Sequence, residues 1–223
     1  LCAFTPYQGK KDRVQGVWMF LRGKGFAVGK HLFPLPDVVY ERIPTRTLER
    51  QPAVQSFLQE LKSRTKVFNQ GFFDKWKIHQ WLSQEPLVRK YLPETHLASA
   101  QTLERMLQKY AMVYLKPIHG SLGFGIYRFW KHRGAYFCDT TTPAGHRRLC
   151  LKDVRSWFER RFRSHSSPYL VQQGIPLITR QGGNVDFRVH LHRDREGHWR
   201  VVAVGAKISR RGGVTTHLRT GGH

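Results

Sequence analysis

The sequence predicts an α/β protein of the mixed α+β kind, and three observations point to this class. Residues 53–64 place apolar side chains at positions i, i+3, i+4 and i+7, which is typical of an amphipathic helix. Residues 184–192 alternate polar and apolar side chains with a period of two, which is typical of a strand. Glycines at 120, 123 and 125 separate two apolar, β-favouring runs. With 223 residues and 40% hydrophobic content, the chain can hold one large domain or two small ones.

Composition narrows the possible partners. The chain has 38 Lys and Arg residues against 15 Asp and Glu, a formal charge of +23, which attracts polyanions. The basic residues are dispersed, and no aromatic-basic RNA-recognition signature appears, so specific nucleic-acid binding is not expected. No apolar run approaches the roughly 20 residues that span a bilayer, so no membrane partner is expected. Three scattered cysteines fit a reducing cytoplasm better than a disulfide framework. The chain begins at Leu1, and we expect that its natural start has been removed.

The first 66 residues should form a small, incomplete α/β subdomain. We expect a strand around residues 17–21, a short buried strand at 38–40, the helix at 53–64 and a strand at 66–69. This strand–helix–strand order suggests an α/β unit over residues 1–66 that precedes a second domain over residues 67–223.

Two helix starts follow. Asp74 can cap a helix whose first turn carries Lys75, and Ser99 starts another whose apolar stripe belongs to the core. A lysine in a first turn opposes the helix dipole. Lys75 is therefore either a tolerated exposed charge or a lysine that contacts phosphate.

The glycine-rich stretch from Val113 to Ile126 is the strongest local signal. Glycines let backbone N–H groups converge on phosphate oxygens, and Lys116 adds a positive charge at the end of the incoming strand. The stretch is not a Walker A loop, because no Gly-Lys-Ser/Thr follows and the next element is a strand. A tight hairpin turn is the simpler alternative.

The later elements alternate strands and a helix. We expect a strand at 135–138, a polar loop at 139–148, a helix over 151–162, a strand at 169–177 and a hairpin made by 184–192 and 199–208. Asp186, Arg188, His190 and His192 share one strand face, where Asp186 can turn Arg188 toward phosphate. Zinc binding is a weaker interpretation, because no cysteine pair completes the histidines. No nucleophilic hydrolase motif is present.

The order of the motifs resembles a known family. Three motifs in succession resemble the ATP-grasp fold, in which antiparallel sheets carry packed helices. They are an Asp-Lys helix start, Leu-Pro-Glu-Thr, and Leu-Lys-Pro before Gly-Ser-x-Gly-x-Gly-Ile. Val-Gln-Gln-Gly-Ile, Asp-Phe-Arg-Val, a Gly-x-Trp hairpin and a Gly-Gly end extend the likeness to the YheC/YheD family of endospore coat-associated ATP-grasp proteins. The run Asn69 to Trp76 is similar to the Phe-Asn-x-x-Phe-Asp-Lys-Trp run of that family. The resemblance is strongest from Val67 to Gly222.

The resemblance implies an ATP site and assigns roles by position. Two lysines hold the phosphates, a mobile glycine loop closes over them, and a hinge meets adenine and ribose. An arginine oriented by an aspartate faces the phosphates. The two lysines are Lys75 and Lys116, and the glycine loop contains Gly120, Ser121, Gly123 and Gly125. The hinge residues are Gln172, Gln173 and Ile175. The arginine is Arg188, and the aspartate is Asp186. Lys207 and Arg210 are looser matches to basic residues that lie near the acceptor or the γ-phosphate. The catalytic residues are not assigned.

The resemblance also implies chemistry of the carboxylate–amine ligase type, in which ATP phosphorylates a carboxylate and an amine then attacks. The carboxylate and amine substrates are unknown, spore-coat proteins are expected partners, and the protein is expected in the cytoplasm or on the spore coat. Family members hold Mg²⁺ through carboxylates on later strands, so we expect the ligands downstream of this chain. A chain truncated at its C-terminus should then be inactive. His217 stands where the family carries Asn. The alternative is a non-catalytic basic coat scaffold or nucleic-acid-binding protein that keeps the fold.

Overall fold

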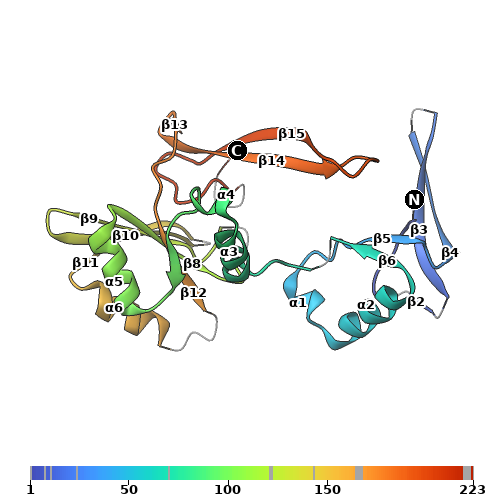
Figure 1. Cartoon of the computed structure of the whole chain (residues 1–223), viewed down its shortest axis with the longest axis horizontal. Coiled ribbons are helices and arrows are strands. Elements are labelled where there is room, and N and C mark those ends of the chain that lie inside the picture. Colours follow the sequence, from blue (N-terminus) through green and yellow to red (C-terminus); the bar gives the residue numbers. More distant parts are fainter. Residues whose placement is uncertain are drawn as a thin grey trace. The chain divides into compact units, whose positions relative to one another are not determined.

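The computed structural model describes residues 2–7, 9–10, 12–23, 25–69, 71–120, 123–142, 144–163, 168–217 and 222. The chain forms two compact units, Leu1–Phe73 and Asp74–His223, each described here by itself (Figure 1). The expected boundary lay after residue 66. The compact units divide later because the strand at Lys66–Phe68 pairs within the first unit. The domain assignment itself stays a prediction.

The first unit begins with a long antiparallel hairpin of β3 (Arg13–Arg22) and β4 (Gly25–Pro34). Two short strands, β1 (Cys2–Ala3) and β2 (Gly9–Lys10), pair along the other edge of β3. The strand expected around residues 17–21 is therefore part of a longer one, and its hairpin partner was not anticipated.

The remainder of the first unit is a β–α–β crossover. Strands β5 (Val38–Tyr40) and β6 (Lys66–Phe68) pair in parallel, and α1 (Arg46–Glu49) and α2 (Pro52–Arg64) connect them. The predicted helix is present and buries Val54, Leu58 and Leu61. The expectation that residues 38–40 are buried is wrong, since Val38 is 54% exposed. A two-stranded sheet leaves alternate side chains in solvent.

The second unit is built on a six-stranded antiparallel sheet with helices packed on it, which confirms the predicted mixed α/β class with antiparallel sheets. In spatial order the strands are β11 (Gly145–Leu151), β10 (Ala135–Thr142), β9 (Tyr127–His132), β8 (Met112–Pro117), β12 (Tyr169–Gln173) and β7 (Thr95–Leu97). The helices are α3 (Lys75–Gln84), α4 (Pro86–Arg89), α5 (Ala100–Lys109) and α6 (Val154–Phe162).

Side chains of α5 and α6 form the core with the sheet. Leu103 and Met106 of α5 are fully buried against Val113 and Phe129 of the sheet, and Trp157 of α6 joins them. The predicted stripe of α5 is therefore core, as expected. The predicted helix starts are also present: Asp74 accepts from the backbone N–H groups of residues 76 and 77, and Ser99 from that of residue 102.

The prediction of a polar loop at 139–148 is wrong. Strand β10 continues to Thr142, and β11 begins at Gly145, so the two strands pair along most of this stretch. β-Branched threonines favour extended backbone, and Asp139 lies opposite Arg148 in register. The charged residues suggested a loop, but in the folded chain their charges compensate one another. Two boundaries also move, since α6 starts after its cap at Asp153 and β12 ends at Gln173.

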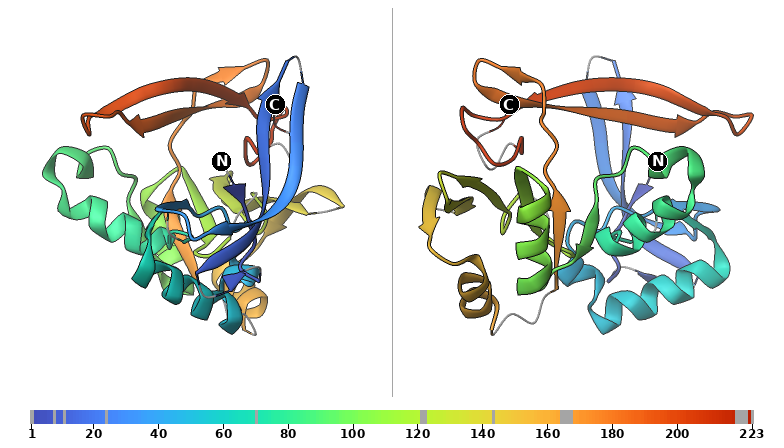
Figure 2. Two further views of the ribbon diagram at one scale, coloured as in Figure 1. Left: turned by 90° about the vertical axis from the view of Figure 1, so that its right-hand side faces the viewer. Right: turned by 60° about the vertical axis from the view of Figure 1, so that its left-hand side comes forward.

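The second unit ends in a three-stranded sheet of β13 (Thr179–Arg180), β14 (Gly183–Arg193) and β15 (Trp199–Ile208). Figure 2 shows β14 and β15 as a long curved ribbon. The predicted hairpin is present, with one irregularity in register between His190 and Leu191. Residues 209–216, called loop 209–216 below, then leave the sheet without regular structure. Within the described part of the chain, no helix has the length and apolar character needed to cross a bilayer.

Glu94 ties three elements of the second unit together. Its carboxylate accepts hydrogen bonds from Lys109 (2.6 Å) and Tyr110 (2.6 Å) at the end of α5 and contacts His96 (2.8 Å) on β7. Its backbone N–H donates to the Gln173 side chain, and its carbonyl accepts from the Gln173 N–H. The bond from Lys109, followed by those from Tyr110 and His96, lowers the pKa of Glu94 from 4.5 to about 2.

We predict that Glu94→Gln destabilises the protein in a pH-dependent way. A lowered carboxyl pKa stabilises the fold above the unfolded pKa, and this contribution is lost as the pH falls from about 4.5 toward 2. Partial solvent exposure limits the expected loss at pH 7 to about 1–2 kcal/mol. Urea unfolding at neutral and acidic pH measures it. Glu104→Gln, on α5, is the control. A loss for Glu94→Gln that stays constant down to acidic pH would contradict the prediction.

Candidate functional site

A cavity of about 290 Å³ lies in the second unit. We call it the hinge cavity, because it borders the segment in which β12 leaves the sheet. The described residues that line it are Pro93, Tyr114, Lys116, Ile126, Gln172, Gln173, Ile175, Leu177, Asn184, Asp186, Val214, Thr215 and Thr216. They come from β8, β12, the start of β14 and loop 209–216, so folding brings together segments that are far apart in sequence.

Lys116 is held in the hinge cavity by hydrogen bonds that cross neighbouring strands. Its ammonium donates to the Gln172 side chain at 2.6 Å. The Gln172 amide donates to the Thr95 hydroxyl at 2.9 Å, and that hydroxyl donates to the Pro93 carbonyl oxygen at 2.9 Å. The ammonium also lies 5.0 Å from the centre of the Tyr114 ring. These contacts position the charge without neutralising it.

The surroundings of Lys116 disfavour the charged form of its side chain. Burial, and then repulsion from Lys75, lower the pKa of Lys116 from 10.5 to about 8, and Asp186 acts in the opposite direction. A largely buried ammonium without a close carboxylate is stabilised when an anion binds next to it. Lys116 is therefore the strongest candidate anion ligand in the hinge cavity.

The hinge segment combines apolar side chains with available backbone groups. Ile175 and Leu177 lie on one part of the wall and Val214 on another. No described residue forms a hydrogen bond with the backbone of Ile175, so its N–H and carbonyl are available to water or a ligand. The chain passes very close to β8 at Gly174, where a Cβ would lie 2.8 Å from the Met112 carbonyl oxygen. Only glycine fits at this position.

Lys75 lies at the base of the glycine loop. Its ammonium donates to the carbonyl oxygens of Pro117 (3.0 Å), Ile118 (3.1 Å) and Gly120. These acceptors match the three donors of an ammonium group, so Lys75 holds the start of the loop in this structure. Gly123 and Gly125 have positive φ angles of 81° and 71°, which glycine adopts without strain. Ser121 lies outside the described residues.

Asp186 lies in the hinge cavity and accepts a hydrogen bond from the Thr216 hydroxyl at 3.1 Å. Lys207 is opposite Asp186 in the register of β14 and β15, and Arg188 pairs in register with Gly205. Arg188 is exposed, and the described residues include no ion pair between it and Asp186. The orienting role of Asp186 therefore stays a prediction.

Five residues predicted from the sequence line the hinge cavity: Lys116, Gln172, Gln173, Ile175 and Asp186. Six others lie outside the described lining, namely Lys75, Gly120, Gly123, Gly125, Arg188 and Lys207. Their proposed contacts with a ligand are not tested by this structure.

Sequence reasoning missed several lining residues. Tyr114 could have been found, because it is two residues before Lys116 on a strand and so shares its face. Asn184 and Thr216 carry no local signal. They reach the cavity only because β14 and loop 209–216 fold back toward β12.

The hinge cavity offers little to a metal ion by itself. Asp186 is the one carboxylate among its described lining residues, and no group of three or more His, Cys, Asp or Glu residues in the described chain could hold a metal. Mg²⁺ in nucleotide sites is bound by one or two carboxylates together with phosphates and water. One carboxylate therefore fits Mg²⁺ only if phosphates and water supply most of its ligands.

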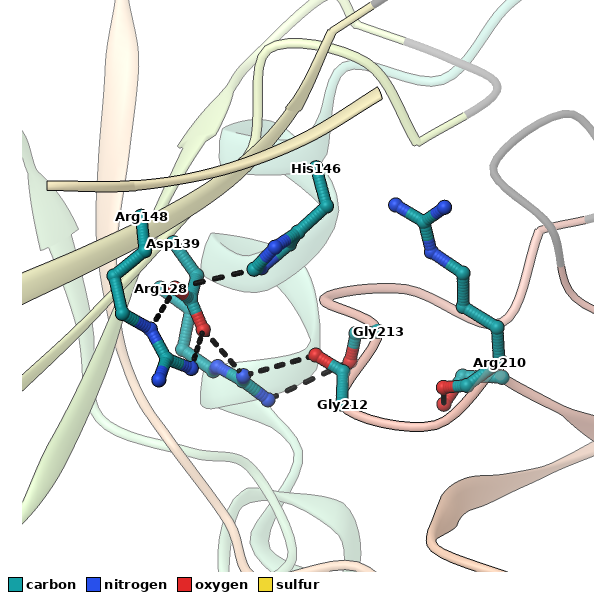
Figure 3. A network of polar contacts seen from close by, with 8 residues as sticks. Arg128, Asp139, His146, Arg148, Arg210, Gly212 and Gly213 are labelled. Atoms are coloured by element: carbon teal, nitrogen blue, oxygen red, sulfur yellow. Dashed lines mark hydrogen bonds and ion pairs between the residues drawn. The ribbon is translucent and has the colours of Figure 1, made fainter.

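Loop 209–216, which contributes to the lining of the cavity, is anchored by an ion network around a buried carboxylate (Figure 3). Asp139 of β10 is completely buried. It accepts from Arg128 at 2.7 Å and from Arg148 at 2.8 and 3.0 Å, and His146 lies 3.4 Å away. Arg128 also donates to the Gly212 carbonyl oxygen at 3.2 Å.

The network keeps Asp139 ionised. Burial alone would raise the pKa of this carboxyl, but hydrogen bonds from Arg148 and Arg128 hold it below its usual value. A buried carboxylate is stable only when it is paired and hydrogen-bonded. The network therefore links β9, β10 and β11 to loop 209–216.

Comparisons with known proteins identify the family of this chain. The sequence model of a family described as YheC/D like ATP-grasp matches residues 64–223, which confirms the resemblance read from the motif order. The chain is 37% identical over 199 residues to the endospore coat-associated protein YheD of Bacillus subtilis (strain 168). It is 21% identical over 234 residues to the endospore coat-associated protein YheC of the same organism.

These two matches cover 86% and 98% of this chain but 44% and 61% of the relatives. The chain therefore spans about half the length of the curated relatives it matches.

We predict that Asp139→Asn destabilises the second unit strongly. The substitution leaves Arg128 and Arg148 without their shared carboxylate, and breaking a buried ion pair costs about 3 kcal/mol or more. Urea unfolding measures the change. Asp194→Asn is a matched control, because Asp194 also pairs with an arginine, Arg200, but on an exposed turn. Equal losses for the two variants would show that the Asp139 network is no stronger than a surface pair.

Proposed function

Because this chain belongs to the YheC/D-like ATP-grasp family, we propose that its second unit binds ATP at the hinge cavity. The observation that carries the proposal is the grouping of Lys116, Gln172, Gln173, Ile175 and Asp186 around one cavity with apolar walls. The family resemblance assigns all five residues to nucleotide binding, and all five line the same cavity.

The size and lining of the cavity suit the nucleoside part of ATP. Its volume of about 290 Å³ is at the lower end of ligand pockets, which begin near 300 Å³. We propose that Ile175, Leu177 and Val214 contact the faces of adenine. The free backbone groups of Ile175 would form hydrogen bonds with the polar edge of adenine, and Gln173 would bind the ribose hydroxyls.

The phosphates would leave the cavity past Lys116. The buried ammonium would bind phosphate oxygens, and the backbone N–H groups of Gly120, Gly123 and Gly125 would close over them. In this proposal Lys75 first fixes the base of the glycine loop and turns to phosphate when ATP is bound. Arg188 and Lys207 would approach the terminal phosphate from β14 and β15.

For the whole protein we propose carboxylate–amine ligase chemistry. A carboxylate oxygen attacks the γ-phosphorus, the bond to the bridging oxygen breaks, and ADP leaves. An amine then attacks the acyl carbon, phosphate leaves, and the nitrogen loses a proton to form an amide. Mg²⁺, when bound, neutralises charge on the phosphates, and Asp186 is the described residue that would contact it. Catalytic residues are not assigned.

The names of the relatives suggest the cellular setting. YheD and YheC are both described as endospore coat-associated, so we propose that this protein acts in the cytoplasm or at the spore coat, with coat proteins as partners. A second function is favoured by the charge of +23: a non-catalytic basic coat scaffold, or a nucleic-acid-binding protein, that keeps the ATP-grasp fold.

Lys116→Met should weaken ATP binding about 10- to 100-fold, because a charge-assisted hydrogen bond contributes about 1.5–3 kcal/mol. Calorimetric titration of ATP with Mg²⁺ into the chain measures the affinity. Lys131→Met is the matched control, since Lys131 is an exposed lysine on β9, and its loss should be less than about twofold.

Repeating the titration at several salt concentrations separates the two functions. A saturable site that persists at moderate salt supports ATP binding. Affinity for ATP and duplex DNA alike, falling steeply with salt and equally in both variants, would support the basic scaffold and overturn the proposal.

The pH dependence of ATP binding should follow Lys116. Its pKa of about 8 in the free protein should rise when phosphates bind, so binding takes up a proton near this pH. The affinity should be constant below about pH 8 and then fall as the pH rises, by up to about tenfold per unit. Titrations between neutral pH and about pH 9.5 measure it. The prediction fails if Lys116→Met shows the same decline as the native chain.

A further inference from the structure

A second and larger cavity, of about 520 Å³, lies on the other side of loop 209–216. We call it the basic cavity. The described residues that line it are His146, Arg148, Arg210, Arg211 and Gly212. It shares no described lining residue with the hinge cavity. Loop 209–216 divides the two, because Arg210 to Gly212 face one cavity and Val214 to Thr216 the other.

The basic cavity has an excess of positive charge. Three arginines and a histidine line it, and the nearest carboxylate, that of Asp139, already binds Arg128 and Arg148. In the described chain, neither Arg210 nor Arg211 forms an ion pair with a carboxylate. Cationic side chains that converge without counter-charges are repelled by one another and are stabilised by a bound anion.

One guanidinium of the cavity is held in a fixed orientation. Arg148 uses its Nε and one terminal nitrogen to bind both oxygens of Asp139. A guanidinium has five N–H donors in a plane, so the second terminal nitrogen of Arg148 remains available. Figure 3 shows His146 and Arg148 on one side of the gap and Arg210 on the other. A fixed donor group together with further arginines that have no carboxylate partner suits a ligand with several oxygen atoms.

We propose that the basic cavity binds a small molecule carrying two or more oxyanions, either a polycarboxylate or a phosphate compound. Arg148 provides the positioned donors, Arg210 and Arg211 provide charge from loop 209–216, and His146 adds a further hydrogen-bonding group. The site is separate from the proposed ATP site, and it stands even if the hinge cavity binds no nucleotide.

Calorimetric titration with two probes, citrate and inorganic pyrophosphate, tests the proposal in about 0.15 M salt, where weak surface attraction is screened. The native chain should bind one or both probes saturably at concentrations below about 10 mM. Arg211→Gln and, separately, Arg210→Gln should each weaken binding about tenfold. Neither guanidinium pairs with a carboxylate of the described chain, so both variants should fold, and a melting curve checks this.

Arg147→Gln is the matched control. Arg147 lies between His146 and Arg148 on β11 and is not among the described lining residues. Its loss should be less than about twofold. Equal losses for Arg147→Gln and Arg211→Gln, or the absence of saturable binding, would overturn the proposal.

Two further measurements identify the class of ligand: the relative affinity of the two probes, and competition with adenosine and ATP. A preference for citrate indicates a carboxylate ligand, and a preference for pyrophosphate a phosphate ligand; both support the site. Adenosine, which has no phosphate, should not displace the probe. Displacement of the probe by ATP but not by adenosine would mean that the basic cavity is only the phosphate end of the ATP site, and the proposal of a separate site would be wrong.

Discussion

The second unit depends on a carboxylate that water cannot reach. Asp139 is completely buried, and only hydrogen bonds from Arg128 and Arg148 make its charge tolerable there. These hydrogen bonds also fix the positions of neighbouring strands and of loop 209–216. They require β9, β10 and β11 to keep their register, and through Arg128 they hold the carbonyl of Gly212 in loop 209–216. Loop 209–216 contributes to the lining of both cavities, and the ion network of Asp139 holds this loop in position.

A second set of polar contacts has the same double role. Lys116, Gln172 and Thr95 connect three neighbouring strands, and the same contacts place an ammonium in the hinge cavity. Glu94 and Gln173 exchange hydrogen bonds at the hinge and also hold the end of α5. Substitutions here alter folding and ligand binding together, so stability must be measured beside affinity for each variant.

Local patterns in the sequence predicted most helices, the hairpin of β14 and β15 and the hinge residues, because each carries its own periodicity, cap or motif. They did not predict the pairing of β10 with β11. Asp139, His146 and Arg148 look like solvent-exposed loop residues until the pairing of β10 with β9 and β11 brings them together with Arg128. The same limit applies to Asn184 and Thr216. Compensation between charges on neighbouring strands depends on the strand register, which the sequence pattern alone did not predict.

Loop 209–216 lines one cavity with Arg210 to Gly212 and the other with Val214 to Thr216. A ligand that drew the loop toward one cavity would change the shape of the other, so the two proposed occupants would be thermodynamically linked. Linkage is reciprocal: if an oxyanion in the basic cavity tightens nucleotide binding by some factor, the nucleotide must tighten oxyanion binding by the same factor. In that case a short loop would couple the two proposed sites through the residues that it contributes to each.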